Sequence, residues 1–433
     1  MRNTLLRLGA DELSYEIRGI VQKAEELENL GYKIHWENIG DPIQKHNEIP
    51  DWIKNTIQQA LDENRSYGYS HSKGLLETRT FLAEKTNALG GIQISPADVT
   101  FFNGLGDAIA KVYQYLLPAA RVIGPSPAYS THSSAEAAHA NAHPVTYNLD
   151  PENNWYPDME DLYMKLKYNS SIVGVLVINP DNPTGMVYQP EILERIVAMA
   201  KEFDLFLIFD EIYQNIVYNE ATTVSMAEVI RDVPGISMKG ISKELPWPGA
   251  RCGWVEYYNR DKDREFARLC QTLDNAKMIE VSSTTLPQLT IPKVMSDPRY
   301  KEFLHATNEK VGKRSRELAK FLGDIEGIRF NQTNGAFYNT IIFEKGVLND
   351  HQSLKIDDPN VHTILKNWLA HDLKHDFRFV YYLLASKKVC VVPISSFASD
   401  LIGFRMTLLE EEPEERLYIF EAIRNGIIEY LQS

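Results

Sequence analysis

Cysteine is scarce in this sequence. Its three residues, Cys252, Cys270 and Cys390, lie far apart in a chain of 433. Three scattered cysteines can form neither a disulfide framework nor a four-ligand zinc site, so they predict a protein of a reducing compartment.

Long apolar runs are also missing. No stretch approaches the roughly 20 apolar residues that span a bilayer. Near the start of the chain, Arg2 and Arg7 are followed by Asp11 and Glu12 instead of an apolar segment. We therefore expect no secretory signal and a cytoplasmic location.

Positive charge is in deficit, with 45 Lys and Arg against 59 Asp and Glu and a net charge of -14. This balance argues against nucleic-acid binding, which requires a basic face. Internal repeats and low-complexity tracts are lacking as well. The composition, 44% hydrophobic and 24% charged, suits a large packed core, and the length predicts two or three domains.

The middle of the chain alternates apolar strands with amphipathic helices. Residues 172–178 and 205–210 are almost continuously apolar, and a helical pattern lies between them at 190–203. This pattern predicts a mostly parallel sheet with crossover helices. Asn182 and Asp210 follow strand ends, at the edge of such sheets where ligands bind.

The flanking segments are more helical, and the alternation weakens after residue 254. Residues 345–375 form a long polar stretch, which we interpret as a surface insertion. His371 and His375 within it have the spacing of a metal pair, but no third ligand is in view, so we predict a solvated helix face. The remaining elements are predicted as helices at 14–30, 51–64, 261–274, 296–322 and from 413 onward, and as strands at 336–343, 389–392 and 404–408.

Residues 240–254 carry the strongest chemical signal. Lys243 and Arg251 flank the turn Pro-Trp-Pro-Gly, which cannot continue a helix and can bring both cations to one pocket. A lysine in a confined pocket can lose its proton and form a Schiff base. An arginine beside it offers a fork for phosphate. Together they suit an aldehyde cofactor with a phosphate tail.

A second phosphate signal lies at residues 99–108, which read as a strand, a turn and a helix start. Gly104 and Gly106 resemble half of a dinucleotide-binding fingerprint, but Ile109 stands where the third glycine belongs. We therefore predict that the amides of this helix start bind a phosphate of another kind.

Three motifs in order resemble the pyridoxal-phosphate-dependent aminotransferases of fold type I, class I/II. They are Asn-Pro-Asp-Asn-Pro-Thr-Gly at 179–185, Phe-Leu-Ile-Phe-Asp-Glu-Ile-Tyr at 206–213, and Ser242-Lys243 with Arg251. The resemblance covers nearly the whole chain. It implies an α/β fold with a large cofactor-binding domain at 49–290. A smaller α+β domain would combine the N-terminal arm, 1–48, with the C-terminal segment, 291–433.

The resemblance also assigns roles to residues. It implies that Lys243 binds the cofactor aldehyde and moves protons, that Asp210 binds the pyridine nitrogen, and that Arg405 binds the substrate carboxylate. The other implied cofactor contacts are Asn182, Tyr213, Tyr129, Leu105, Gly106, Arg251 and Tyr69, with Tyr213 also counted as catalytic, and Gly40 and Asn182 are the further substrate contacts.

Two positions bear on how the phosphate is held. Tyr69, five residues before Gly74, is implied to reach the cofactor phosphate of the neighbouring subunit, which predicts a homodimer. Gly240 stands where the family usually has Ser or Thr, so the phosphate site has one donor fewer or recruits Ser237.

The resemblance implies an aminotransferase that moves an amino group between an L-amino acid and a 2-oxo acid by a ping-pong aldimine mechanism. Glutamate and 2-oxoglutarate are the expected first pair, with an alanine or aspartate type as the second. Trp247 and Tyr15 are candidates for the side-chain pocket. The alternatives are a carbon–sulfur beta-lyase on the same fold and a cofactor-binding sensor domain of a transcription regulator. The sensor domain is disfavoured because Lys and Arg are not clustered.

Overall fold

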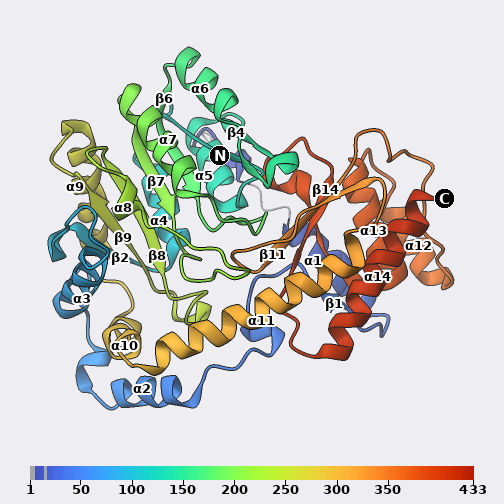
Figure 1. The fold of residues 1–433 in the computed structure, drawn as a ribbon, viewed down its shortest axis with the longest axis horizontal. Helices are drawn as coiled ribbons and strands as arrows, with labels where there is room; N and C mark the ends of the chain where they lie inside the picture. The colour runs from blue at the N-terminus through green and yellow to red at the C-terminus, as the bar shows by residue number, and fades with distance from the viewer. Residues whose placement is uncertain (1–4, 14–16) are drawn as a thin grey trace.

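The computed structural model describes residues 5–13 and 17–433. A large sheet with the strand order β2-β9-β8-β7-β6-β3-β4-β5 organises its first two thirds (Figure 1). Its central pairings, from β8 through β7, β6 and β3 to β4, are parallel, whereas β9, β2 and β5 pair antiparallel at the edges. The strands are β2 Val99–Phe102, β3 Arg121–Ser126, β4 Thr146–Asp150, β5 Tyr156–Pro157, β6 Ile172–Ile178, β7 Phe206–Asp210, β8 Gly235–Gly240 and β9 Gly253–Tyr258.

Helices cover both faces of this sheet, as crossover connections require. Side chains of β6 alternate between two cores: Val175 and Val177 pack in one, and Leu176 and Ile178 pack in the other. Because both faces are buried, the strand reads as an uninterrupted apolar run. The helices of this part are α2 Asp51–Leu61, α3 Leu76–Asn87, α4 Leu105–Gln114, α5 Ser130–Ala140, α6 Met159–Tyr168, α7 Pro190–Glu202, α8 Met226–Val229, α9 Arg264–Ile279 and α10 Thr285–Met295.

A second, antiparallel sheet has the order β10-β11-β14-β13 and is joined by the short parallel pair β1-β12 nearby. Its apolar residues form a separate core, here called the second core, around Phe379, Phe404 and Ile423. The strands are β1 His35–Trp36, β10 Ile328–Phe330, β11 Tyr338–Phe343, β12 Val389–Cys390, β13 Val392–Pro393 and β14 Gly403–Thr407; the helices are α1 Ile17–Glu28, α12 Pro359–Trp368, α13 His375–Lys387 and α14 Pro413–Leu431.

Helix α11, Arg299–Leu322, connects the two parts (Figure 1). Tyr300 near its start belongs to the core of the large sheet, and Val311, Leu318 and Leu322 belong to the second core. The predicted α/β class with a smaller α+β part is therefore confirmed. The domain limits at residues 48 and 290 stay a prediction.

The stretch 345–375 is not the surface insertion that we expected from the sequence. Leu354, Val361 and Leu365 are buried in the second core, so its helix α12 is part of the packed body. His375 lies 3.2 Å from Asp350 Oδ1.

Across residues 5–13 and 17–433, no helix has both the length and the apolar character needed to cross a bilayer.

Candidate active site

A cavity of about 380 Å³ lies at the carboxyl ends of β6 and β7, facing β14 and the loop that follows β8. The loop after β1 closes another side through Asn38, Ile39 and Gly40. Ten of the residues predicted from the sequence line this one cavity: Gly40, Leu105, Gly106, Tyr129, Asn182, Asp210, Tyr213, Lys243, Arg251 and Arg405.

Asp210 is the last residue of β7 and is buried. Its Oδ1 accepts from the Ile212 amide at 3.1 Å, and its Oδ2 lies 3.1 Å from Nε2 of the buried His132 on α5. The Tyr129 ring is 6.4 Å from the His132 ring, edge to face. A buried carboxylate fixed from two sides can pair with a protonated ring nitrogen.

His132 was not predicted, although it orients the key acid. It lies three residues after Tyr129 on a helix whose polar residues look alike in sequence. Only its contact with Asp210 across the fold separates His132 from the other polar residues of α5.

Lys243 is half-buried in the loop after β8 and lines the same cavity. Its Nζ donates to the Gly40 carbonyl at 2.6 Å and lies 5.9 Å and 5.7 Å from the ring centres of Tyr213 and Phe337. An amine between two aromatic rings and one carbonyl has few partners that compete for it. It is therefore placed to react with an aldehyde in the cavity.

One end of the cavity is built for an anion. Leu105 and Gly106 open α4, where the first amides have no partner within the helix. Gly104 caps this helix at φ 82°, and a Cβ placed there would lie 2.6 Å from Arg251 Nη2. The guanidinium therefore packs against the backbone of the helix start. Backbone amides and a guanidinium side by side have the donor chemistry that suits a phosphate group.

The surroundings of Gly240 leave little space for the Ser or Thr that the family usually has at this position. A Cβ at this position would meet Ile212 Cδ1 at 3.0 Å and the Cys252 carbonyl oxygen at 3.1 Å. The predicted recruitment of Ser237 is wrong, because its hydroxyl donates to Glu211 and is fully buried away from the cavity. Ser242, by contrast, lines the cavity.

The other end of the cavity presents Arg405 on β14. Its Nη1 donates to Asn182 Oδ1 at 3.1 Å, its Nη2 donates to the Asn38 carbonyl, and its guanidinium lies 4.4 Å from the Tyr338 ring centre. In the described part of the chain, Arg405 Nε and both polar side-chain atoms of Asn38 are buried without a partner. Buried donors without partners indicate a polar ligand that satisfies them.

Tyr338 shapes the middle of the site and, like Asn38, was not predicted. Its hydroxyl lies 3.0 Å from that of Tyr213, and a Cβ on Gly40 would come within 1.8 Å of it. Gly40 is therefore needed for this close approach. Burial, together with Tyr338, raises the pKa of Tyr213, so its hydroxyl stays protonated near neutral pH.

Tyr69 is the one predicted site residue outside the cavity lining, and its side chain is 85% exposed. Its loop is tied to the start of α10, where Thr285 Oγ1 donates to the Gly68 carbonyl at 2.8 Å. Of the two side-chain pocket candidates, Trp247 packs against the core of the large sheet and Tyr15 lies outside the described residues.

This fold and this constellation define a pyridoxal-phosphate-dependent enzyme of fold type I. The chain belongs to the family "Aminotransferase class I and II", whose model matches residues 37–422. It is an aminotransferase, as the sequence motifs predicted.

Three relatives place the chain within the family. It is 54% identical to an uncharacterized aminotransferase of Methanocaldococcus jannaschii over 436 aligned residues, which cover 100% of both chains. It is 32% identical to the glutamate-pyruvate aminotransferase of Escherichia coli K12 over 247 residues, 57% of this chain and 60% of that one. The solved structure of alanine aminotransferase from Pyrococcus furiosus has a TM-score of 0.85 and 26% identity, covering 98% of this chain and 100% of that one.

Proposed function

We propose that this chain transfers an amino group between L-alanine and 2-oxoglutarate, giving pyruvate and glutamate, in two alternating half-reactions. The observation that carries the proposal is the single cavity that joins Lys243, Asp210 and Arg405. The anion site of Leu105, Gly106 and Arg251 lies at one end of this cavity and the buried Arg405 at the other, with Asp210 and Lys243 also in its lining.

The cavity fits pyridoxal phosphate in the chemistry of its donors. The amides of Leu105 and Gly106 with Arg251 would hold the phosphate, and Asp210 would hold the ring nitrogen. Tyr213 and Asn182 would face the ring hydroxyl, and the Tyr129 ring would stack on the cofactor ring. When bound, the cofactor supplies an aldehyde that bonds to amines and a ring that draws electrons from the substrate.

Residues of the chain would bind the substrate and hold the protons that the reaction moves. Asp210, held in place by His132, would keep the ring nitrogen protonated, which strengthens the electron withdrawal that the ring supplies. Arg405 holds the substrate α-carboxylate in a two-pronged pair. The free Lys243 amine would take up the proton from the substrate α carbon and would hold it on Nζ for transfer.

Alanine as the amino donor is supported by relatives whose names state glutamate-pyruvate and alanine aminotransferase activity. The apolar lining residues Val21 and Ile39 suit a small neutral side chain. The cationic lining residues are Lys243, Arg251 and Arg405, and each already has a role. The distal carboxylate of 2-oxoglutarate needs a donor as well, and among the described residues no further cation lines the cavity, so we place that donor outside this lining.

The active unit is proposed to be a homodimer in which Tyr69 completes the phosphate site of the partner. Tyr69 and Tyr67 are 85% and 75% exposed, and Ile279 at the end of α9 is 84% exposed. Large exposed apolar side chains of this kind favour an interface. The Tyr69 hydroxyl does not line the cavity of its own protomer, so a second copy gives it a role.

An absorption titration tests the reaction. The visible band of the cofactor-loaded protein should bleach with L-alanine and return with 2-oxoglutarate, with pyruvate released in the first step. Borohydride reduction followed by peptide mass spectrometry should place the cofactor on Lys243. A stronger response to L-aspartate would move the chain to the aspartate type. Pyruvate and ammonia released from a cysteine conjugate, without exchange, would indicate the beta-lyase.

A hybrid dimer tests the shared site. Lys243→Ala and Tyr69→Ala proteins should each be poorly active alone. If Tyr69 serves the partner, a dimer of the two variants contains one site with both residues intact and recovers about half of the wild-type activity. If Tyr69 serves its own protomer, both sites of the hybrid stay defective and no activity returns.

A further inference from the structure

Glu244, the residue after Lys243, lies on the far side of the loop from the cavity and is 7% exposed. Its carboxylate accepts four hydrogen bonds. The backbone amide and the side-chain amide of Asn215 donate to Oε1, both at 3.0 Å, and the Asn215 side chain also reaches Oε2 at 2.9 Å. Tyr300 Oη donates to Oε2 at 3.2 Å.

These contacts come from the turn after β7 and from helix α11. Asn215 belongs to the turn after β7 that also presents Tyr213 to the cavity, and Tyr300 is the second residue of α11. Asn308 of α11 donates to the Asn215 carbonyl at 2.8 Å, which closes the arrangement. The lysine loop, the Tyr213 turn and the connecting helix therefore meet at one carboxylate.

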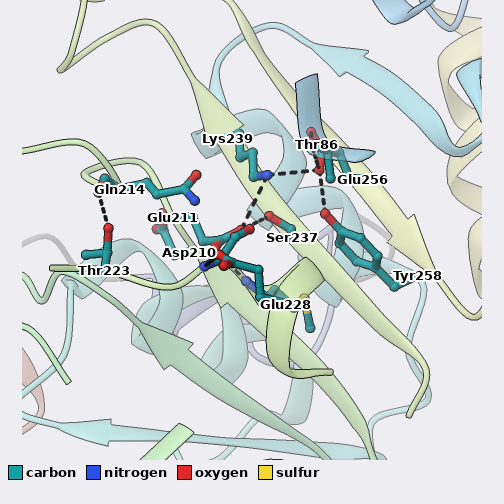
Figure 2. A network of polar contacts seen from close by, with 12 residues as sticks. Thr86, Asp210, Glu211, Gln214, Thr223, Glu228, Ser237, Lys239, Glu256 and Tyr258 are labelled. Atoms are coloured by element: carbon teal, nitrogen blue, oxygen red, sulfur yellow. Dashed lines mark hydrogen bonds and ion pairs between the residues drawn. The ribbon is translucent and has the colours of Figure 1, made fainter. Parts of the chain in front are cut away.

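The turn to which Glu244 binds is itself rigid. Glu211 at its start accepts from the Met226 amide at 2.8 Å and from Ser237, and Lys239 of β8 lies 3.7 Å away (Figure 2). Lys239 also pairs with Glu256 of β9 at 2.9 Å. Near the other end of the turn, Thr223 Oγ1 donates to the Gln214 carbonyl at 2.7 Å. A fixed turn can serve as a reference for the position of the lysine.

Within residues 5–13 and 17–433, no cation lies within ion-pair distance of Glu244. Its four hydrogen bonds come from neutral donors, and Lys85 and Lys239 attract it only over a longer distance. Hydrogen bonds to a charged acceptor are shorter and stronger than neutral ones, and four of them fix the carboxylate in direction as well as distance. Burial and the Glu244 carboxylate raise the pKa of Tyr300, so its hydroxyl stays a donor.

We propose that Glu244 is a positioning residue for Lys243: by binding Asn215 and Tyr300 it sets where the lysine amine stands relative to Tyr213 and the substrate. It does not touch the cavity itself. The inference rests on the proposed role of Lys243 as the lysine that binds the cofactor.

The test compares the wild type with Glu244→Gln and Tyr300→Phe, all loaded with pyridoxal phosphate. Glutamine keeps the size but replaces one acceptor oxygen by a donor that faces the Asn215 amide. A misplaced amine should lower kcat about 10- to 100-fold. KM for the amino acid should not rise, because Arg405 is untouched. The circular dichroism of the visible band, which reports the setting of the bound cofactor, should change as well.

Tyr300→Phe removes one of the four hydrogen bonds and should change the same quantities in the same direction but less. Glu317→Gln is the matched control. That residue also ties α11 by a carboxylate, to Arg416 at 3.0 Å, but far from the lysine loop. It should leave kcat and the visible dichroism at the wild-type values.

Wild-type kcat and dichroism in Glu244→Gln, or a rise in KM alone, would overturn the inference. If Glu244→Gln does not fold, Tyr300→Phe decides by the same criteria. A wild-type protein that shows no visible band with pyridoxal phosphate would instead refute the proposed function, so the two failures are distinguishable.

Discussion

Gly104→Ala is the substitution that most directly tests the anion end of the cavity. Gly104 adopts φ 82° and ψ 164°, a backbone region that is essentially restricted to glycine. Holding alanine there should cost about 1–3 kcal/mol of unfolding free energy. This cost is independent of any ligand and should appear in urea unfolding of the cofactor-free protein.

The second effect concerns Arg251. The new Cβ would stand 2.6 Å from Nη2, and the flexible end of the arginine must move away. A lost hydrogen bond to a charged group is worth about 1.5–3 kcal/mol. That corresponds to about 10- to 100-fold weaker binding of pyridoxal phosphate. Fluorescence titration of the cofactor-free protein measures this affinity directly.

Gly249→Ala is the control for Gly104→Ala. It lies two residues before Arg251, and a Cβ there meets nothing within 4 Å. We expect wild-type unfolding and wild-type affinity. An unchanged free energy of unfolding in Gly104→Ala would refute the assigned backbone conformation. Reduced stability with unchanged affinity would refute the assignment of Arg251 to the phosphate.

Two further predictions concern Arg405 and the buried Asp181, which lies in the turn after β6. Arg405→Lys replaces a planar fork by a point charge and should raise KM about 10- to 100-fold for every amino acid substrate, measured by steady-state kinetics; an effect on one substrate only would contradict it. Burial raises the pKa of Asp181 to about 7, so the folded chain holds this proton while the unfolded chain releases it near pH 4. Stability should therefore fall as pH rises from about 4 to about 7, and between pH 5 and pH 8 Asp181→Asn should remove about 3 kcal/mol of this loss in urea unfolding. An equal pH dependence in both proteins would contradict the raised pKa.

The large sheet and the reactive ends of the site could be predicted because their signals are local. An apolar run followed by a polar residue, as at Asp210, marks a buried strand that ends at a ligand edge. Lys243 and Arg251 stand in one short loop, so their spacing is visible in the sequence.

The remaining site residues could not be predicted because they act across the fold. His132 reaches Asp210 over 78 positions, and Tyr338 meets Tyr213 over 125. Nothing in their neighbouring residues marks them. The stretch 345–375 was misjudged for a related reason: Leu354 sits among polar residues but is buried against a core built from other segments.

The length of helix α11 couples small movements at one end to larger ones at the other. Its 24 residues make a rod of about 36 Å, with one end bonded to the lysine loop and the other packed beside α14. A tilt of about 5° around Tyr300 would carry the far end by about 3 Å. Over this length, a change too small to break a hydrogen bond at Glu244 becomes a displacement as large as a water molecule where α11 packs beside α14.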